Sequence, residues 1–181
     1  MNLLLLFLPF YFLNPTLLSK VSSEVSVPPK LAISLKGNIL KVGKKKFPVN
    51  DWKVEHFSQA LGDKKRFEPG SNNIHTYDSH GLMLYETADI PGEVKAFSIF
   101  FQANNEFDFY PTTLFTGALT VEGKKITGAL TYQDFQNLFA GYEFRQAYGQ
   151  TYTVDFDKVY MYIEFSDPAL TKLKFVNLGY R

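Results

Sequence analysis

The chain has 181 residues, of which 45% are hydrophobic and 20% charged, a balance typical of a folded globular protein and not of a disordered one. Because 19 Lys and Arg face 18 Asp and Glu, there is no basic excess, and a nucleic-acid partner is not expected. The absence of cysteine excludes disulfides, a thiol nucleophile, cysteine-ligated zinc and a lipid-modified cysteine. Aromatic residues make up 17% of the chain, which favours packed strands over a helical bundle.

Residues 1–23 are expected to form a signal peptide. Residues 2–18 are almost entirely apolar, but the run contains Pro9 and Pro15 and is shorter than the about 20 residues that cross a bilayer as a helix. The small residues Val21-Ser22-Ser23 suit a cleavage site, and the mature chain would then be periplasmic or secreted. The alternative is an uncleaved segment that anchors the protein, which would be its only contact with a membrane.

An extended lead-in is expected over residues 24–30, because the Pro28-Pro29 pair disfavours a helix. Apolar residues then alternate with polar ones, and the glycines at positions 37 and 43 suit turns, so the pattern predicts a run of short strands. These strands are expected over residues 31–35, 39–42 and 46–49.

The first helix is expected to begin with Asn50 or Asp51 as its N-cap and to end at Leu61, before Gly62. Its apolar face consists of Val54, Phe57 and Leu61. A turn over residues 78–81, with Asp first and Gly last, suits a type I turn between two of the strands that follow. The three strands are expected over residues 73–78, 82–87 and 94–101.

This order of elements recurs about 77 residues later in the chain. The two turn glycines correspond to Gly117 and Gly123, and a capping box of Thr131 with Asp134 predicts the start of a second helix that Gly141 ends. The apolar face of this helix consists of Tyr132, Phe135 and Phe139. Three more strands are expected over residues 152–156, 159–165 and 170–178.

The sequence therefore predicts an α+β fold made of two tandem units. Each unit is expected to be an antiparallel sheet with one helix on a face, and a face left open in each should bring the two units onto a shared core. The units span residues 31–103 and 113–178 within a single domain of residues 31–181.

No catalytic, cofactor or metal site is expected. His75, Asp78 and His80 form the only cluster of metal-ligand residue types, but the predicted strand and turn make these side chains diverge, so turn and surface positions are expected. His56 is expected on the exposed side of the first helix. No Gly-x-Ser-x-Gly turn, no glycosidase-like carboxylate pair and no phosphate-binding glycine loop is present. The chain is therefore not expected to be an enzyme.

The connector over residues 102–112 carries the candidate partner-binding residues, which are Phe107, Asp108, Phe109 and Tyr110. Aromatic side chains are favoured as anchors at protein interfaces. The acids Glu106 and Asp108 oppose deep burial of the whole run, because an unpaired buried carboxylate is costly. The alternative is that the rings pack inward and seal the seam between the two units.

Two basic clusters, residues 44–46 and 64–66, flank the first helix. Solvated turns explain both clusters, and an acidic protein partner or an anionic surface is the alternative.

Four motifs carry a resemblance to known families. They are Gly37-Asn-Ile-Leu-Lys-Val-Gly43-Lys-Lys, Phe57-Ser-Gln-Ala-Leu-Gly62, Tyr77-Asp-Ser-His-Gly81-Leu and Thr116-Gly-Ala-Leu-Thr-Val-Glu-Gly-Lys-Lys-Ile126. Over about residues 31–178, the chain resembles an uncharacterised bacterial family of tandem α+β proteins of unknown function, some of them immunity-like. The helix and hairpin motifs are also similar to the repeats of β-lactamase-inhibitory proteins and small envelope-assembly lipoproteins, although those repeats begin with two helices. Neither resemblance supplies catalytic residues.

The function that the sequence predicts is an exported, non-enzymatic module that binds another protein, as an inhibitor or an immunity-like protein does. One alternative is a structural or assembly factor of the bacterial envelope, and another is a small-ligand-binding protein.

Overall fold

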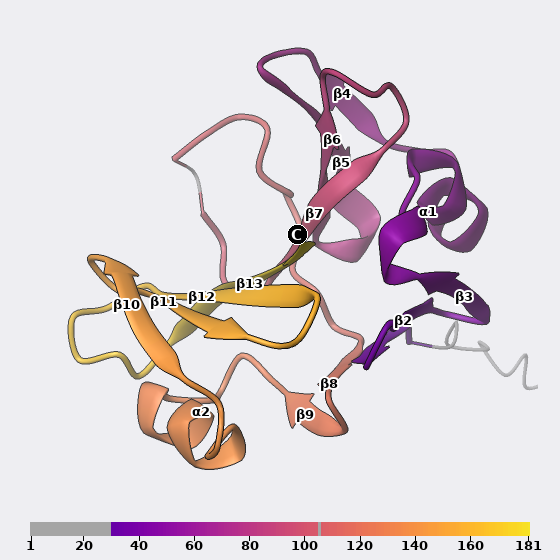
Figure 1. Cartoon of the computed structure of the whole chain (residues 1–181). Helices are drawn as coiled ribbons and strands as arrows, with labels where there is room; N and C mark the ends of the chain where they lie inside the picture. Colours follow the sequence, from indigo (N-terminus) through magenta and orange to yellow (C-terminus); the bar gives the residue numbers. More distant parts are fainter. Residues whose placement is uncertain (1–29, 105) are drawn as a thin grey trace, which may run out of the picture.

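The computed structural model describes residues 30–104 and 106–181, which form two β-sheets and two short α-helices (Figure 1). The predicted signal peptide and nearly all of the predicted lead-in lie outside the described residues. The first half of the chain contains β1 (Ala32–Lys36), β2 (Ile39–Val42), β3 (Lys45–Pro48), β4 (Arg66–Glu68), β5 (Asn72–Tyr77), β6 (Leu82–Thr87) and β7 (Val94–Phe100). The second half contains β8 (Ala118–Val121), β9 (Lys124–Ile126), β10 (Phe144–Tyr148), β11 (Thr151–Asp155), β12 (Val159–Phe165) and β13 (Leu173–Tyr180).

The helices are α1 (Val54–Leu61), which follows β3, and α2 (Tyr132–Leu138), which follows β9. Helix α2 begins as predicted, because Thr131 and Asp134 form a capping box. Helix α1 ends as predicted at Gly62, which has a φ of 88° and donates its N–H to the Ser58 carbonyl at 2.8 Å. The predicted N-cap of α1 is wrong, because residues 49–51 form a separate 3-10 turn and Lys53 precedes the helix.

The smaller sheet has the strand order β3-β2-β1-β8-β9, and its middle is a parallel pairing of β1 with β8. Ile33 lies opposite Leu119 and Leu35 lies opposite Val121, and all four side chains are buried. The two halves of the chain are therefore joined at the centre of this sheet.

The larger sheet has the order β10-β11-β12-β13-β7-β6-β5-β4 and is antiparallel throughout. Its middle is the pairing of β13 with β7, in which Val176 lies opposite Ile99 and Leu178 opposite Phe97. The sequence pattern does not predict the short edge strands β4 and β10, because β4 has only three residues and β10 does not alternate apolar with polar residues.

The predicted α+β fold of two tandem units, each an antiparallel sheet with one helix, is wrong. The described residues are mostly β, with 13 strands in two sheets and helices of only eight and seven residues. The physical reason lies in β1 and β7, which carry buried side chains and would leave one row of backbone N–H and C=O groups unpaired within a single unit. Strands of the second half satisfy these groups, so each sheet is built from both halves.

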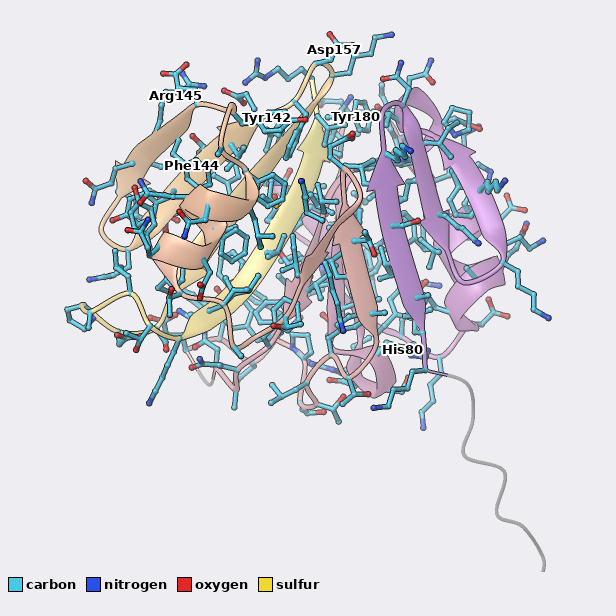
Figure 2. All side chains as sticks on the ribbon, turned by 90° about the horizontal axis from the view of Figure 1, so that it is seen from below. His80, Tyr142, Phe144, Arg145, Asp157 and Tyr180 are labelled. Atoms are coloured by element: carbon cyan, nitrogen blue, oxygen red, sulfur yellow. The ribbon has the colours of Figure 1, made fainter. Side chains whose placement is uncertain are left out.

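The inner face of the larger sheet packs on the helices and the smaller sheet. Helix α1 covers the β4–β7 part and α2 covers the β10–β13 part, with the smaller sheet near both (Figure 1). Phe57 of α1 lies 5.4 Å from Phe97 on β7, and Phe135 of α2 lies 6.2 Å from Phe165 on β12, measured between ring centroids. Side chains fill the space between these layers (Figure 2), and one hydrophobic cluster contains residues of both halves.

The opposite side of the larger sheet is here called the outer face. A row of directly paired residues crosses this face from one edge strand to the other, and paired residues of a sheet share a face. The row consists of Arg66, Thr76, Met83, Ser98, Asn177, Tyr162, Thr153 and Arg145. Near its middle, the Asn177 amide donates a hydrogen bond to Ser98 Oγ at 3.0 Å.

Replacing Phe135 with Ala should lower the free energy of unfolding by about 3–5 kcal/mol, because the ring is fully buried between α2 and the larger sheet. Urea denaturation measures this change. Asn137→Ala, an exposed position on the same helix, is the matched control and should change stability by less than about 0.5 kcal/mol. Equal losses for the two variants would contradict the assigned packing of α2.

Candidate functional site

The connector between β7 and β8 crosses the outer face of the larger sheet, and three of its aromatic side chains contact one another there. Phe107 and Phe109 stack with their ring centroids 5.0 Å apart and their planes 6° from parallel. Tyr110 meets both rings edge-on, at 5.3 and 5.1 Å. We call Phe107, Phe109 and Tyr110 the aromatic cluster.

The aromatic cluster rests on the sheet through Tyr110. The Tyr110 ring lies 5.1 Å from Phe100, a fully buried residue of β7 that in turn contacts Phe175 of β13 at 5.5 Å. Tyr110 and Phe109 are half-buried, whereas Phe107 is 51% exposed. The rings of the cluster therefore differ in exposure, because Tyr110 packs against the sheet while Phe107 faces solvent.

Arg66 of β4 holds the backbone of the cluster in place. Its guanidinium donates to both carboxylate oxygens of Asp78, at 2.6 and 3.0 Å, and also to the backbone carbonyls of Asp108 and Tyr110, at 2.7 and 2.8 Å. Thr76, which lies opposite Arg66 in the sheet, donates its hydroxyl to the Phe109 carbonyl at 2.6 Å. Three consecutive carbonyls of the connector, residues 108–110, are thus bonded to strand side chains.

Asp78 fixes the segment that follows the cluster. One of its carboxylate oxygens accepts the Thr112 backbone N–H at 2.8 Å and the Thr112 hydroxyl at 3.0 Å, and the Thr113 hydroxyl bonds to the Asp78 carbonyl. Hydrogen bonding to Arg66 lowers the pKa of Asp78 from its ordinary 3.8 to about 2, and the bonds from Thr112 act in the same direction. The carboxylate is therefore charged at neutral pH.

Gly81 permits the close approach of the connector's end. It has a φ of 63°, and a Cβ at this position would overlap the backbone of Leu114 and Phe115. The predicted type I turn over residues 78–81 is a short 3-10 turn, and its final glycine is required for both of these reasons.

The start of the connector is tied to the other half of the larger sheet. Lys174 of β13 donates to Glu106 at 3.2 Å and to Glu164 of β12 at 2.6 Å. Burial alone would lower the pKa of Lys174, but its bonds to the two carboxylates raise it. The connector is therefore fastened at both ends, to β13 on one side and to β4 and β5 on the other.

Tyrosine hydroxyls around the cluster stay protonated at neutral pH. Burial raises the pKa of Tyr85 to about 12, and burial likewise raises the pKa of Tyr110 to about 12. Both phenols can therefore donate hydrogen bonds, and neither adds charge to the outer face.

The three histidines have separate roles in the fold. His75 Nε2 lies 2.5 Å from a Glu86 carboxylate oxygen in a buried pair on the inner face, so the expected surface position of His75 is wrong. His56 is half-buried and stacks on Phe47 at 4.8 Å, so its expected exposed position is also wrong. His80 is bonded to the Leu61 carbonyl at 3.1 Å. Within residues 30–104 and 106–181, no three His, Asp or Glu side chains converge as metal ligands would.

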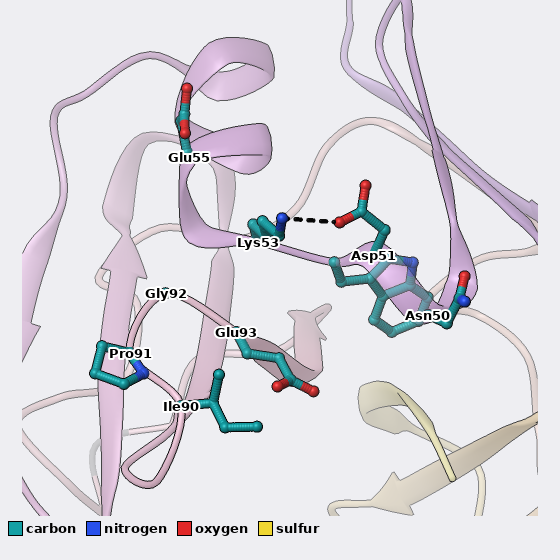
Figure 3. Close-up of a pocket in the computed structure, with 9 residues that line it drawn as sticks. Asn50, Asp51, Lys53, Glu55, Ile90, Pro91, Gly92 and Glu93 are labelled. Carbon is teal, nitrogen blue, oxygen red and sulfur yellow. Dashed lines mark ion pairs between the residues drawn. The ribbon is translucent and has the colours of Figure 1, made fainter.

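A surface hollow of about 460 Å³ lies between the start of α1 and the turn before β7 (Figure 3). Its charged groups already have partners in the chain. Lys53 pairs with Asp51 at 3.2 Å, and Glu93 accepts bonds from Lys95 and Tyr180. We therefore assign no ligand to this hollow.

Sequence reasoning missed two parts of the outer face. Arg66 belongs to the basic cluster 64–66, and the expectation of a solvated turn is wrong for it, because its partners lie 12 to 44 residues away in the sequence. A second group, over β10–β12, includes Arg145, Asp155 and Tyr160. Tyr160 alternates with the buried residues Val159 and Met161 of β12. This alternation was the sequence signal that the Tyr160 ring lies on the outer face.

The fold and the aromatic cluster define a mostly β protein of two sheets that presents aromatic side chains from a fastened connector. Residues 32–136 match the model of a family described as a domain of unknown function (DUF7738). Since this match covers more than half of the chain, the protein belongs to that family, and the expected membership of an uncharacterised family is confirmed. No curated protein and no solved structure matches the chain. Neither helix of the described residues has the length and apolarity needed to cross a bilayer.

An NMR titration of the Asp78 side-chain carboxyl should give a midpoint near 2, and the Arg66→Gln variant should move it toward 3.8. Because the folded pKa lies below the unfolded one, Asp78 stabilises the fold fully above about pH 5, and this contribution is lost as the pH falls through about 2. Arg145→Gln, a surface arginine at the opposite edge of the sheet, is the control and should leave the midpoint unchanged. A midpoint near 2 in Arg66→Gln would show that another group holds the pKa down.

Proposed function

We propose that the protein acts by binding another protein through the aromatic cluster, as an inhibitor or immunity-like module. The observation that carries the proposal is Phe107, whose ring is half exposed although the backbone around it is bonded to Arg66 and Thr76. An aromatic side chain held in one position loses little conformational entropy when a partner covers it. Such rings are the residue type that most often supplies binding energy at interfaces.

The charges beside the cluster suit a partner with basic groups around an apolar recess. Glu106 and Asp108 flank Phe107 and are both exposed, and the Asn104 side chain and Lys174 lower the pKa of Glu106. Exposed carboxylates at the rim of an interface mainly accelerate encounter with an oppositely charged partner and discriminate against wrong ones. The apolar ring and the acidic rim together define the partner's complementary surface.

Export is part of the proposal and rests on the apolar residues 2–18 and the small residues at 21–23. The partner is accordingly sought in the cell envelope or outside the cell. An inhibitor or immunity-like role agrees with an exposed aromatic anchor beside exposed carboxylates.

Phe107→Ser should reduce capture of the partner by at least about tenfold while leaving the melting temperature nearly unchanged, because the ring is half exposed and anchors of this kind contribute 2 kcal/mol or more. The measurement is an affinity pull-down from the envelope fraction of the source cell, quantified by mass spectrometry. Ile90→Ser, which removes an apolar side chain that is 53% exposed elsewhere, is the matched control.

Three outcomes would contradict the proposal. If Phe107→Ser lowers the melting temperature by many degrees, the ring serves packing and the binding surface lies elsewhere. If wild type and Phe107→Ser capture the same proteins equally, the aromatic cluster is not the anchor. A partner found only among cytosolic proteins would contradict export.

A further inference from the structure

A second hollow, of about 410 Å³, lies on the outer face over β10–β12. Two guanidiniums meet at it, because Arg145 of β10 and Arg181, which follows β13, bond to opposite carboxylate oxygens of Asp155. The side chains of Arg145 and Arg181 are 54% and 58% exposed, whereas that of Asp155 is 24% exposed. The shared carboxylate therefore lies below two outward-facing cations.

The arginine donors of this hollow favour an anion. Its lining contains two arginines and one acid, and a second carboxylate, that of Glu143, lies beside Arg145. Each guanidinium has five N–H donors and uses one of them, on Nη2, for its hydrogen bond to Asp155. Glu143 lies 3.9 Å from Arg145 Nε, too far for a hydrogen bond, and its side chain is 75% exposed. Donors remain on both arginines for an incoming oxyanion.

Two tyrosines form the floor of the hollow. The Tyr160 and Tyr162 rings meet edge-on at 5.0 Å, and both residues are half-buried. Tyr160 can lie against β13 because its neighbour there is Gly179, where a Cβ would overlap the ring. Burial raises the pKa of Tyr160, so its phenol is protonated at neutral pH and is a hydrogen-bond donor. Tyr160 therefore adds one neutral donor beside the two charged groups.

The hollow and the aromatic cluster lie on one face. The transverse row of the larger sheet begins at Arg66, which holds the cluster, and ends at Arg145, which lines the hollow. Glu106, beside the cluster, bonds to Lys174 of β13, and β13 lies three strand spacings, about 14 Å, from β10. A standard protein interface covers about 800 Å² on each partner, a patch about 30 Å across. One partner of ordinary size can therefore contact both features.

We propose that the hollow over β10–β12 binds a carboxylate side chain of the same partner protein whose apolar recess receives Phe107. This inference rests on the proposed function for its partner, and it requires that partner to carry an Asp or Glu side chain within about 30 Å of the recess. Guanidinium groups match carboxylates in a planar, two-bonded geometry, which gives orientation as well as attraction. The aromatic cluster would supply the apolar anchor, and the hollow would fix the rotation of the partner about it.

The first experiment uses the whole chain and a small probe, so its result does not depend on a partner being found. Acetyl-glutamate methylamide is titrated while the side-chain Nε–Hε signals of Arg145 and Arg181 are followed by NMR. Both signals are expected to shift and to saturate with a dissociation constant in the millimolar range, and acetyl-glutamine methylamide is expected to cause no shift. Arg145→Gln should weaken binding about tenfold, and Lys125→Gln, an exposed cation of the smaller sheet, should leave it unchanged.

Asp155→Asn separates recognition from a structural role. Removing this carboxylate leaves both arginines without their present partner, so the probe should bind more tightly, whereas a purely structural ion pair would give no gain. Arg145→Lys keeps the charge and loses the planar fork, so intermediate binding is expected. If one of the variants Arg145→Gln, Arg145→Lys or Asp155→Asn lowers the melting temperature, the probe affinities of the other two decide whether the hollow recognises a carboxylate.

Three results would overturn the proposal. Equal shifts with the glutamine analogue, or with chloride alone, would show that the hollow does not recognise a carboxylate, and tight binding of inorganic phosphate without binding of the glutamate probe would assign it to a free oxyanion. In the pull-down, Arg145→Glu should release the partner that Phe107→Ser also releases. If Arg145→Glu leaves capture intact while Phe107→Ser abolishes it, the proposed function stands and the hollow lies outside the interface.

Discussion

The pairing of β7 with β13 is the contact on which the rest of the structure depends. Six of the seven residues of β7 are buried, so its free edge lies in the interior, where unpaired N–H and C=O groups are costly. Only a strand of the other half satisfies that edge. The connector begins at the end of β7, and its Tyr110 packs on Phe100 of β7 while its Glu106 bonds to Lys174 of β13. The same contact thus builds the core and positions the aromatic cluster.

Each helix start is held in the same way in both halves. The N–H of Val54, at the start of α1, bonds to the Gly92 carbonyl at 2.9 Å, and the N–H of Tyr132, at the start of α2, bonds to the Leu170 carbonyl at 3.0 Å. Both carbonyls belong to residues with positive φ in the turn before the last strand of each half. This correspondence is what an internal duplication would produce, and the duplication itself remains a prediction from the sequence.

Features set by neighbouring residues could be predicted from the sequence, and features set by distant ones could not. Gly62 and Thr131 act within their own helices, so one end of each helix was predictable, as were most strands. The pairing of β7 with β13 depends on residues about 80 positions apart, and local patterns do not report it. Likewise, Phe107 was a candidate from its local sequence, whereas the Arg66 bonds and the hollow at Arg145 required the fold. His75 shows the same limit, because its buried position depends on Glu86 of the next strand.

The distance in sequence between β7 and β13 also has a consequence during synthesis. At about 5–20 residues per second, the partner of β7 leaves the ribosome roughly 4–16 s after β7 itself. During that interval the nascent first half carries two open strand edges, β1 and β7, both rich in side chains that end up buried. The nascent first half is therefore prone to aggregate, and the time for which it is exposed to aggregation depends on how quickly the ribosome completes the second half.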